Sequence, residues 1–248
     1  MFRRIQWFMD KLLALFVRDA KRPFLPKSCF PWIQRVEANW KTIRQEFGAV
    51  LYEQERIPNV EDVSQDGNLG ADRKPMSRGA EWKWFFLYGY GHKIESNCAR
   101  CPKTTQLVET IPGMQGAIFA ILAPGKHIPA HRGLYKGLLR YHLGVQVPLP
   151  VGICRITVGG ETRAWEDGQS FIFDDTFTHE AWNDSDVQRV VLMIDVERPL
   201  PLPLAMLNRL ILRWITSTAY INDAIERVKA PAFTAPNQAE PRLPSERA

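Results

Sequence analysis

Between residues 114 and 199 the chain alternates short apolar runs with Gly, Pro and Asp turns. Six of these runs are rich in the β-branched and aromatic residues that favour strands: 114–124 (MQGAIFAILAP), 138–148 (LLRYHLGVQVP), 152–160 (GICRITVGG), 161–168 (ETRAWEDG), 169–175 (QSFIFDD) and 188–199 (QRVVLMIDVERP). An aromatic segment at 81–91 has the same character. Such close spacing predicts an all-β sandwich, jelly roll or barrel instead of alternating β/α units, so the expected class is mainly β with flanking helices (α+β).

Four segments carry apolar residues at helical spacing. The first, at 1–23, is amphipathic and basic, and proline residues end it. The second runs from Trp32 to Phe47, and the third is a short helix within 101–112. The fourth covers 201–228 and carries Leu207, Leu210, Ile211, Trp214 and Ile215 on one stripe. These helices are expected to flank the β core.

The remaining segments complete the expected organisation. A polar, Gly-containing stretch at 58–80 predicts a long loop. Four prolines and few apolar groups after residue 230 predict a disordered tail. The expected parts are an N-terminal helix and linker at 1–30, a central domain at 31–200 with its β core at about 81–200, a helical segment at 201–230 and a tail at 231–248.

The positive charge of the chain is concentrated at its N-terminus. The formal net charge is +5, and residues 1–27 hold seven Lys or Arg against two Asp, so the rest is close to neutral. This distribution argues against a broad nucleic-acid surface and for a local contact with an anionic surface. The N-terminal helix therefore has two interpretations: it packs on the domain, or it lies in the headgroup region of an anionic membrane.

Cysteine usage and the lack of targeting signals predict a cytoplasmic protein, which would be peripheral at the inner face of the cytoplasmic membrane if the basic helix binds lipid. Four scattered cysteines are too few for a disulfide framework, and the pair in "CARC" lacks the second pair that a zinc site needs. The first twenty residues lack the apolar run and cleavage site of a signal peptide. No apolar run approaches the length of about 20 residues that spans a bilayer.

Histidine and arginine side chains mark the candidate site. His131 stands in the turn before the strand at 138–148, and His179 follows the strand at 169–175. Neutral imidazole is the commonest metal ligand. Arg140 and His142 alternate on one face of an otherwise apolar strand, and Arg189 opens the next one. Because a buried arginine needs an anion and its planar fork suits a carboxylate, these residues together predict a pocket for a metal and a dicarboxylate.

The order of these motifs resembles a known family. The segments "APGKHIPAHRG", "LRYHLGV", "WEDGQSFIFDDTFTHEAWN" and "QRVVLMIDVERP" are similar to the aspartyl/asparaginyl β-hydroxylases over about residues 81–200. The resemblance implies a double-stranded β-helix that uses Fe(II), 2-oxoglutarate and dioxygen. Such an enzyme decarboxylates 2-oxoglutarate to succinate and hydroxylates an unactivated C–H bond, with the oxidising power supplied by the cofactor.

The resemblance also implies roles for individual residues. His131 and His179 match the iron ligands. Arg189 matches the arginine that grips the distal carboxylate of 2-oxoglutarate, while Arg140 and His142 match the pair that faces its metal-chelating end. These five side chains are therefore the expected iron and cosubstrate site.

Five further positions are informative by comparison with the family. Trp82 matches an aromatic residue of the same pocket, whereas Ala120 replaces a serine that assists the distal carboxylate in the peptide-modifying branch. In a His-x-Asp facial triad the third ligand would stand at Gly133, where no side chain can coordinate. Asp174 and Asp175, shortly before His179, could support a ligand or a bound water, or could belong to a turn.

Two branches of the family are compatible with these residues. "GLYKGLLRYHLG" and "DVERPL" resemble the bacterial hydroxylases of lipid A acyl chains and of ornithine lipids, and the basic N-terminus agrees with a lipid substrate. Gly133 and "FDDTFTHEAWN" resemble the branch that acts on aspartyl or asparaginyl residues. The primary hypothesis is a lipid acyl-chain hydroxylase, the alternative is a hydroxylase of aspartyl or asparaginyl groups or of an amino acid, and retention of both histidines and both arginines argues against a non-catalytic binding module.

Overall fold

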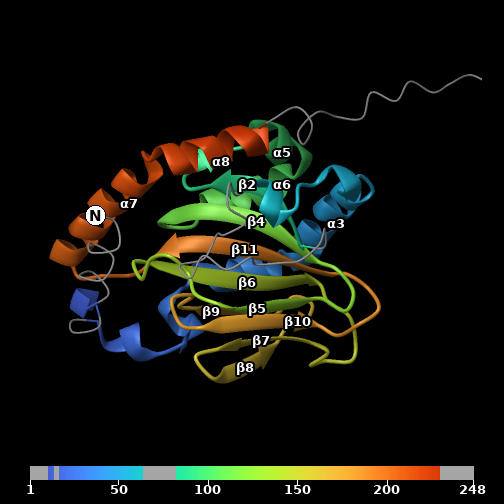
Figure 1. Cartoon of the computed structure of the whole chain (residues 1–248), viewed down its shortest axis with the longest axis horizontal. Helices are drawn as coiled ribbons and strands as arrows, with labels where there is room; N and C mark the ends of the chain where they lie inside the picture. The colour runs from blue at the N-terminus through green and yellow to red at the C-terminus, as the bar shows by residue number, and fades with distance from the viewer. Residues whose placement is uncertain (1–10, 14–16, 64–81, 230–248) are drawn as a thin grey trace, which may run out of the picture.

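Two stacked antiparallel sheets form the centre of the computed structural model, which describes residues 11–13, 17–63 and 82–229 (Figure 1). The seven-stranded sheet has the order β1-β9-β6-β11-β4-β2-β3, and the four-stranded sheet has the order β5-β10-β7-β8. The strands are β1 (Phe24–Leu25), β2 (Trp82–Gly89), β3 (His92–Lys93), β4 (Met114–Leu122), β5 (His127–His131), β6 (Leu138–Gln146), β7 (Cys154–Val158), β8 (Glu161–Ala164), β9 (Ser170–Phe173), β10 (His179–Asn183) and β11 (Arg189–Glu197). The predicted mainly β, jelly-roll-like class is confirmed.

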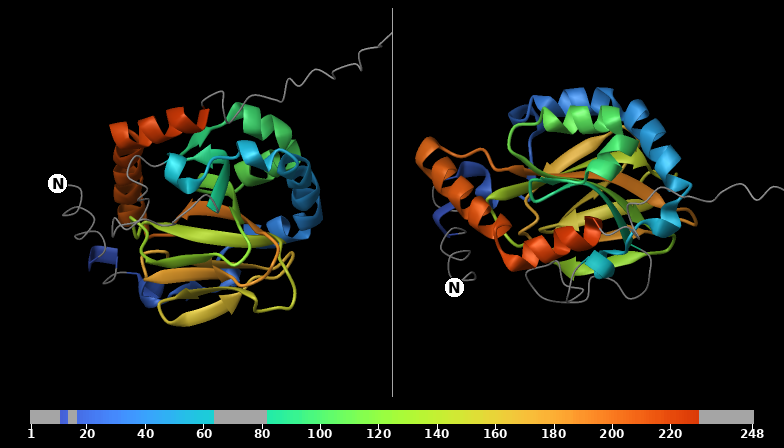
Figure 2. Two further views of the ribbon diagram at one scale, coloured as in Figure 1. Left: turned by 45° about the vertical axis from the view of Figure 1, so that its right-hand side comes forward. Right: turned by 90° about the horizontal axis from the view of Figure 1, so that it is seen from above.

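Helices flank the seven-stranded sheet. They are α2 (Trp32–Ala38), α3 (Trp40–Leu51), α4 (Val60–Val63), α5 (Glu95–Arg100), α6 (Pro102–Glu109), α7 (Leu202–Thr216) and α8 (Ala219–Lys229). Short 3-10 helices cover Arg18–Lys21, Lys27–Cys29 and Gln54–Arg56. Seen from above, α7 and α8 form an elbow on one side of the sheets, and α2 and α3 lie on the other side (Figure 2).

Strand alternation creates two separate cores. On β6, Tyr141 and Leu143 join the cluster that packs against α2 and α3. Arg140 and His142 alternate with them and therefore point to the other face of the sheet, toward the four-stranded sheet. The core between the sheets is rich in aromatic residues such as Trp165. The sequence pattern correctly predicted that Arg140 and His142 lie on the same face of this strand.

Three of the four predicted helical segments lie within the described residues and are helical, and two of these three are interrupted. The segment expected as one helix at 32–47 is divided between α2 and α3 at Asn39, whose Nδ2 donates to the Arg35 carbonyl (2.8 Å). The segment expected at 201–228 is divided at Ser217 and Thr218, whose hydroxyls donate to the carbonyls of Trp214 and Ile215. In each case a short polar side chain donates to a backbone carbonyl that would accept from a backbone N–H group if the helix continued.

The sequence pattern missed the strands β5 and β10. Their segments, HIPAH and HEAWN, are short and contain polar residues or proline. Pro129 is tolerated because β5 is an edge strand. The linker expected at the end of the 1–30 segment likewise contributes β1, which pairs with β9. Tertiary pairing, more than local propensity, makes these segments extended.

Several expectations lie partly or wholly outside the described residues. Of the predicted N-terminal helix, Lys11–Leu13 is helical and Arg18–Lys21 is 3-10 helix. Within the loop expected at 58–80, the described part contains α4. The predicted tail is not described. No helix in the described ranges has the length and hydropathy of a bilayer-spanning segment.

Candidate active site

His131 and His179 face each other across a pair of neighbouring strands. His131 is the last residue of β5 and His179 the first residue of β10, and they are direct antiparallel partners. Their ring centroids lie 4.1 Å apart, and both residues are buried. The sequence had placed His131 in a turn and His179 after a strand. Register, which sequence alone did not reveal, is what brings the two rings together.

Hydrogen bonds fix the same tautomer on both rings. His131 Nδ1 lies 2.8 Å from the carbonyl of Pro129, and His179 Nδ1 lies 2.9 Å from the carbonyl of Phe177. Because a carbonyl only accepts, each Nδ1 carries a proton, and Nε2 is the ring nitrogen left to bind a metal. Burial, together with the neighbouring His131, lowers the pKa of His179 to about 3. His179 is therefore neutral near pH 7, as a metal ligand must be.

Gly133 leaves room for a carboxylate from another part of the chain. A Cβ added to Gly133 would lie 2.2 Å from Cγ of Asp175. The Gly133 N–H also donates to the Asp175 carbonyl (2.7 Å). Burial raises the pKa of Asp175 to about 6. Within the described ranges no three His, Cys, Asp or Glu residues are grouped as a complete metal site, so the two histidines are the candidate protein ligands and Asp175 lies beside them.

Asp174 and Asp175 have different surroundings although they are adjacent. Asp174 is fully buried and accepts bonds from Lys136 Nζ (2.8 Å), Arg198 and the Thr176 backbone N–H (3.0 Å). It therefore holds a turn together. Asp175 instead lines the cavity beside the histidines. Lys136, a residue type usually found at the surface, is buried against Asp174.

Arg189 lies at the end of a cavity that also contains the two histidines. Its guanidinium stacks on Trp165, with Cζ 4.4 Å from the ring centroid. It is buried, its Nε has no hydrogen-bond partner among the described residues, and burial lowers its pKa to about 10. A buried cation without an acid is costly. The position is therefore suited to an anionic ligand that brings the missing carboxylate.

His142 and three tryptophans add further donors without partners. Both ring nitrogens of His142 lack hydrogen-bond partners among the described residues, as do the Nε1 atoms of Trp82, Trp84 and Trp165. Burial, with Arg140 and Arg189 nearby, lowers the pKa of His142 well below its usual value. Trp82 and Ala120 line the cavity, as the resemblance implied. Buried polar groups without partners mark a place where a polar ligand is expected.

Arg140 differs from Arg189 because acids of the chain already hold it. Its Nε and Nη2 donate to the carboxylate of Asp195 at 2.8 and 3.1 Å, across the β6–β11 pair. Its Nη1 also lies 3.3 Å from Asp175. We expected both arginines to require an external anion, but within the described residues only Arg189 does. Arg140 still lines the cavity next to the histidines.

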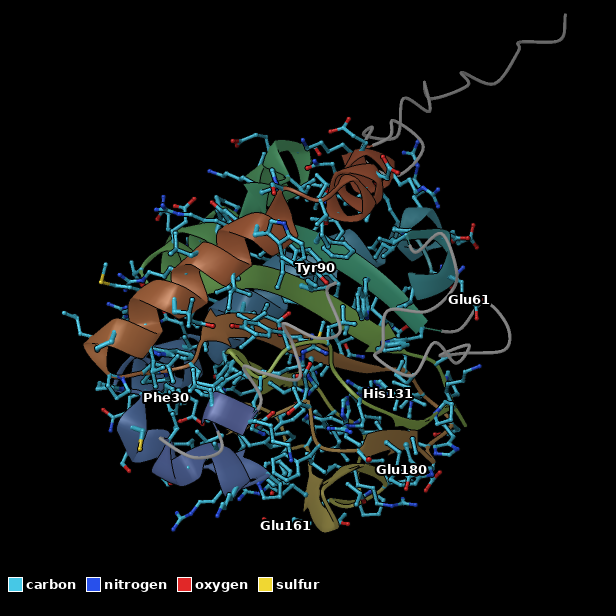
Figure 3. All side chains as sticks on the ribbon, turned by 60° about the vertical axis from the view of Figure 1, so that its left-hand side comes forward. Phe30, Glu61, Tyr90, His131, Glu161 and Glu180 are labelled. Atoms are coloured by element: carbon cyan, nitrogen blue, oxygen red, sulfur yellow. The ribbon has the colours of Figure 1, made fainter. Side chains whose placement is uncertain are left out.

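A second, larger cavity opens on the other side of the histidines. It shares His131, His179 and Arg140 with the Arg189 cavity. Its walls come from the segment 131–140, from β2 and β4, and from the elbow of α7 and α8. Its apolar lining residues are Val63, Trp84, Phe86, Ile118, Leu134, Leu138, Leu139, Leu212, Ile215, Ala224, Ile225 and Val228. Figure 3 shows Tyr90, another wall residue, in the angle between the two helices. The apolar spacing of these helices was visible in the sequence, but nothing there indicated that they cover the site.

The family model for aspartyl/asparaginyl β-hydroxylase matches residues 37–199, which include both histidines and Arg189. The chain belongs to the aspartyl/asparaginyl β-hydroxylase family. This agrees with the resemblance read from its motifs, and it makes the protein a hydroxylase of the oxygenase class.

Two relatives represent the two branches of the family. An ornithine lipid ester-linked acyl 2-hydroxylase from Rhizobium tropici is 37% identical over 228 residues, covering 92% of this chain and 79% of the relative. The human aspartyl/asparaginyl β-hydroxylase is 34% identical over 172 residues, covering 67% of this chain but only 21% of the relative. Among solved structures, the cupin domain of a transcriptional regulator from Enterobacter cloacae matches 48% of this chain and all of that domain, at 12% identity and a TM-score of 0.34.

Proposed function

We propose that this member of the aspartyl/asparaginyl β-hydroxylase family is an Fe(II)- and 2-oxoglutarate-dependent hydroxylase of an acyl chain in a membrane lipid of the lipid A or ornithine-lipid type. The observation that carries the proposal is the apolar cavity that meets the two histidines. An acyl chain needs an apolar channel, because each buried CH₂ contributes about 0.8 kcal/mol. The similarity to an ornithine lipid hydroxylase supports the same substrate class.

The residues at the centre fit an iron ion. His131 and His179 would hold it through Nε2, since each Nδ1–H is bound to a backbone carbonyl. Those carbonyl bonds orient the rings before the metal arrives and raise their basicity. The Asp175 carboxylate occupies the space beside Gly133, from which it could accept a hydrogen bond from a water next to the histidines. When bound, iron with 2-oxoglutarate and dioxygen supplies the oxidising power that no side chain has.

The Arg189 cavity fits 2-oxoglutarate. The Arg189 guanidinium would pair with the distal carboxylate, as a planar fork pairs with two oxygens, and this would neutralise a buried charge that has no acid among the described residues. His142 is neutral and buried in the same cavity and can donate one hydrogen bond to the cosubstrate. Trp165, stacked on Arg189, excludes water from this end.

The remaining residues orient the substrate and keep water away. The ion pair between Arg140 and Asp195 stands where the two cavities meet and holds Asp175 beside the histidines. The apolar walls would align an acyl chain so that one C–H bond faces the two histidines. Arg132, at the rim, is exposed and donates through Nε to the Thr176 carbonyl (2.6 Å); its remaining N–H groups could meet an anionic headgroup.

One feature favours a second candidate, hydroxylation of aspartyl or asparaginyl groups. Gly133 is the residue that the peptide-modifying branch has at this position, and Arg132 beside it could pair with a substrate carboxylate. The apolar lining of the larger cavity weighs against a short polar side chain, which would leave most of that surface uncovered.

The test is a direct comparison of substrates. The purified chain with Fe(II), 2-oxoglutarate and dioxygen is incubated with detergent-dispersed ornithine lipid, with lipid A, or with aspartyl- and asparaginyl-containing peptides. We expect succinate formation and the gain of one oxygen in an acyl chain. Narrowing the cavity by Ala224→Trp should reduce lipid turnover, whereas Ala99→Trp, outside the cavity, should not. Oxygen gain in a peptide alone would replace the primary proposal with the second candidate.

A further inference from the structure

Helix α7 carries an apolar stripe on its outer surface. Four large side chains at intervals of four residues are exposed: Leu202 (79%), Met206 (61%), Leu210 (61%) and Trp214 (40%). A step of four residues keeps side chains on neighbouring positions of one helix surface. The stripe therefore runs along the whole of α7 instead of being a set of isolated exposures.

The concentration of these residues is unusual for the described part of the chain. The other large apolar side chains found exposed there are single or paired residues in loops and turns, namely Tyr52, Leu149, Val151 and Val187. Single exposed apolar residues are ordinary, whereas a contiguous apolar strip marks an interaction surface.

The charge of α7 is entirely positive. The helix contains Arg209 and Arg213 and no acidic residue. The spacing puts both arginines along one side of the stripe. Arg209 reaches Glu197 (3.3 Å) while staying largely exposed, and no carboxylate among the described residues pairs with Arg213. An apolar strip bordered by arginines is complementary to an anionic lipid surface.

The inner face of α7 is fixed above the candidate active site. The Asn208 side chain accepts from Tyr135 Oη (2.7 Å) and donates to the Gly137 carbonyl (3.1 Å). Leu212 and Ile215, on the same face, line the apolar cavity. A single helix therefore separates the exposed stripe from the proposed acyl channel.

A polar cleft lies between α7 and the turn that follows β2. Its polar lining is made by Tyr90, His92, Gln115, Glu197, Arg209 and Arg213. Tyr90, Gln115, Leu212 and Thr216 belong to both this cleft and the apolar cavity. The arrangement offers an amphiphile two adjoining surfaces, a polar one for a headgroup and an apolar one for a chain.

We propose that α7 lies in the surface of an anionic membrane, with its stripe among the lipid chains and its arginines at the headgroups, so that a lipid can enter the cavity without leaving the bilayer. This proposal rests on the proposed function, because membrane docking serves the enzyme only if its substrate is a lipid. A second copy of this chain is a less suitable partner, because a two-fold contact through the stripe would bring the arginines of both copies together.

Vesicle sedimentation tests the surface with the full chain. Vesicles of phosphatidylglycerol and phosphatidylcholine should bind it, and pure phosphatidylcholine should bind it less. Met206→Ser with Leu210→Ser should weaken binding by about tenfold, whereas the matched pair Leu149→Ser with Val151→Ser should not. Arg213→Gln should weaken binding to the anionic vesicles roughly fivefold, and Lys103→Gln, exposed on α6, should leave it unchanged.

The outcomes separate this proposal from the proposed activity. The Met206→Ser/Leu210→Ser variant should still hydroxylate detergent-dispersed lipid, because neither residue lines the cavity. If the Met206→Ser/Leu210→Ser variant binds vesicles as well as the parent chain does, the docking surface is overturned. The docking surface would also be overturned if the parent chain binds no vesicles and light scattering shows it to be a dimer that the double substitution converts to a monomer. If the parent chain binds vesicles but hydroxylates no lipid, the activity fails and the surface stands.

Discussion

The carboxylate of Asp175 fills the space into which a side chain on residue 133 would project. A Cβ on Gly133 would lie 2.2 Å from Cγ of Asp175, and a backbone hydrogen bond of 2.7 Å joins the two residues. In a His-x-Asp site the acid would come from the strand of His131. Here the acid beside residue 133 is Asp175, from the segment that leads into His179, and the glycine leaves room for it.

A side chain at residue 133 should therefore destabilise the protein. We expect Gly133→Ala to lower the free energy of unfolding by about 1–3 kcal/mol, the usual cost of overpacking, and Asp175→Ala in the same chain to restore part of the loss. Gly48→Ala is the control, because a Cβ there meets nothing within 4 Å and alanine favours a helix. Urea unfolding measures the stability of all three variants. A Gly133→Ala variant as stable as the parent would contradict the observed contact.

Removing His179 should abolish metal binding. We expect His179→Ala and His131→Ala each to weaken Fe(II) binding by more than the roughly 10- to 100-fold typical of groups that only orient a ligand. His127→Ala is the matched control, since that ring is exposed and contacts Glu180 (3.1 Å). Calorimetric titration with Fe(II) under anaerobic conditions gives the affinities, and unchanged binding by His179→Ala would show that the ligand assignment is wrong.

Arg189 should matter more for the cosubstrate than for folding. Because no acid among the described residues pairs with it, Arg189→Met should leave the ligand-free protein as stable as the parent or more so. The same variant should lose the rise in Tm that 2-oxoglutarate causes in the metal-loaded parent. Arg198→Met, which breaks a buried pair with Asp174, should instead cost about 3–5 kcal/mol. Equal losses of stability in both variants would contradict the distinction.

The pH dependence of the metal-free protein should report the buried His179. Its pKa in the folded state is about 3, below the 6.5 of an exposed imidazole. Between these values the unfolded chain binds a proton that the folded chain excludes, so stability is lost as the pH falls from 6.5 toward 3. The slope is about 1.4 kcal/mol per pH unit for one proton. Urea unfolding with a chelator present should show a smaller slope of the free energy of unfolding against pH in His179→Gln. An identical slope in the variant and the parent would contradict the lowered pKa of His179.

Periodicity in the sequence was sufficient to predict the β core and the strand face that forms one wall of the site. Alternation by two residues places Arg140 and His142 on the same face of β6 and Tyr141 on the other, because successive side chains of a strand point to opposite sides. The motif order was also sufficient to indicate the family. Local chemistry did not predict β5 and β10, whose extended form depends on pairing with each other and with β7.

The sequence by itself determined most of the strands, the family and the kinds of side chain at the site. The tertiary structure decided how those side chains are shared: Arg140 is held by Asp195, Arg189 is left for a ligand, and Asp175 fills the space beside Gly133. It also decided that the C-terminal helices form a wall of the apolar cavity. These relationships join residues far apart in the chain, and local periodicity carries no information about which distant groups meet, because register and packing are set by the whole core.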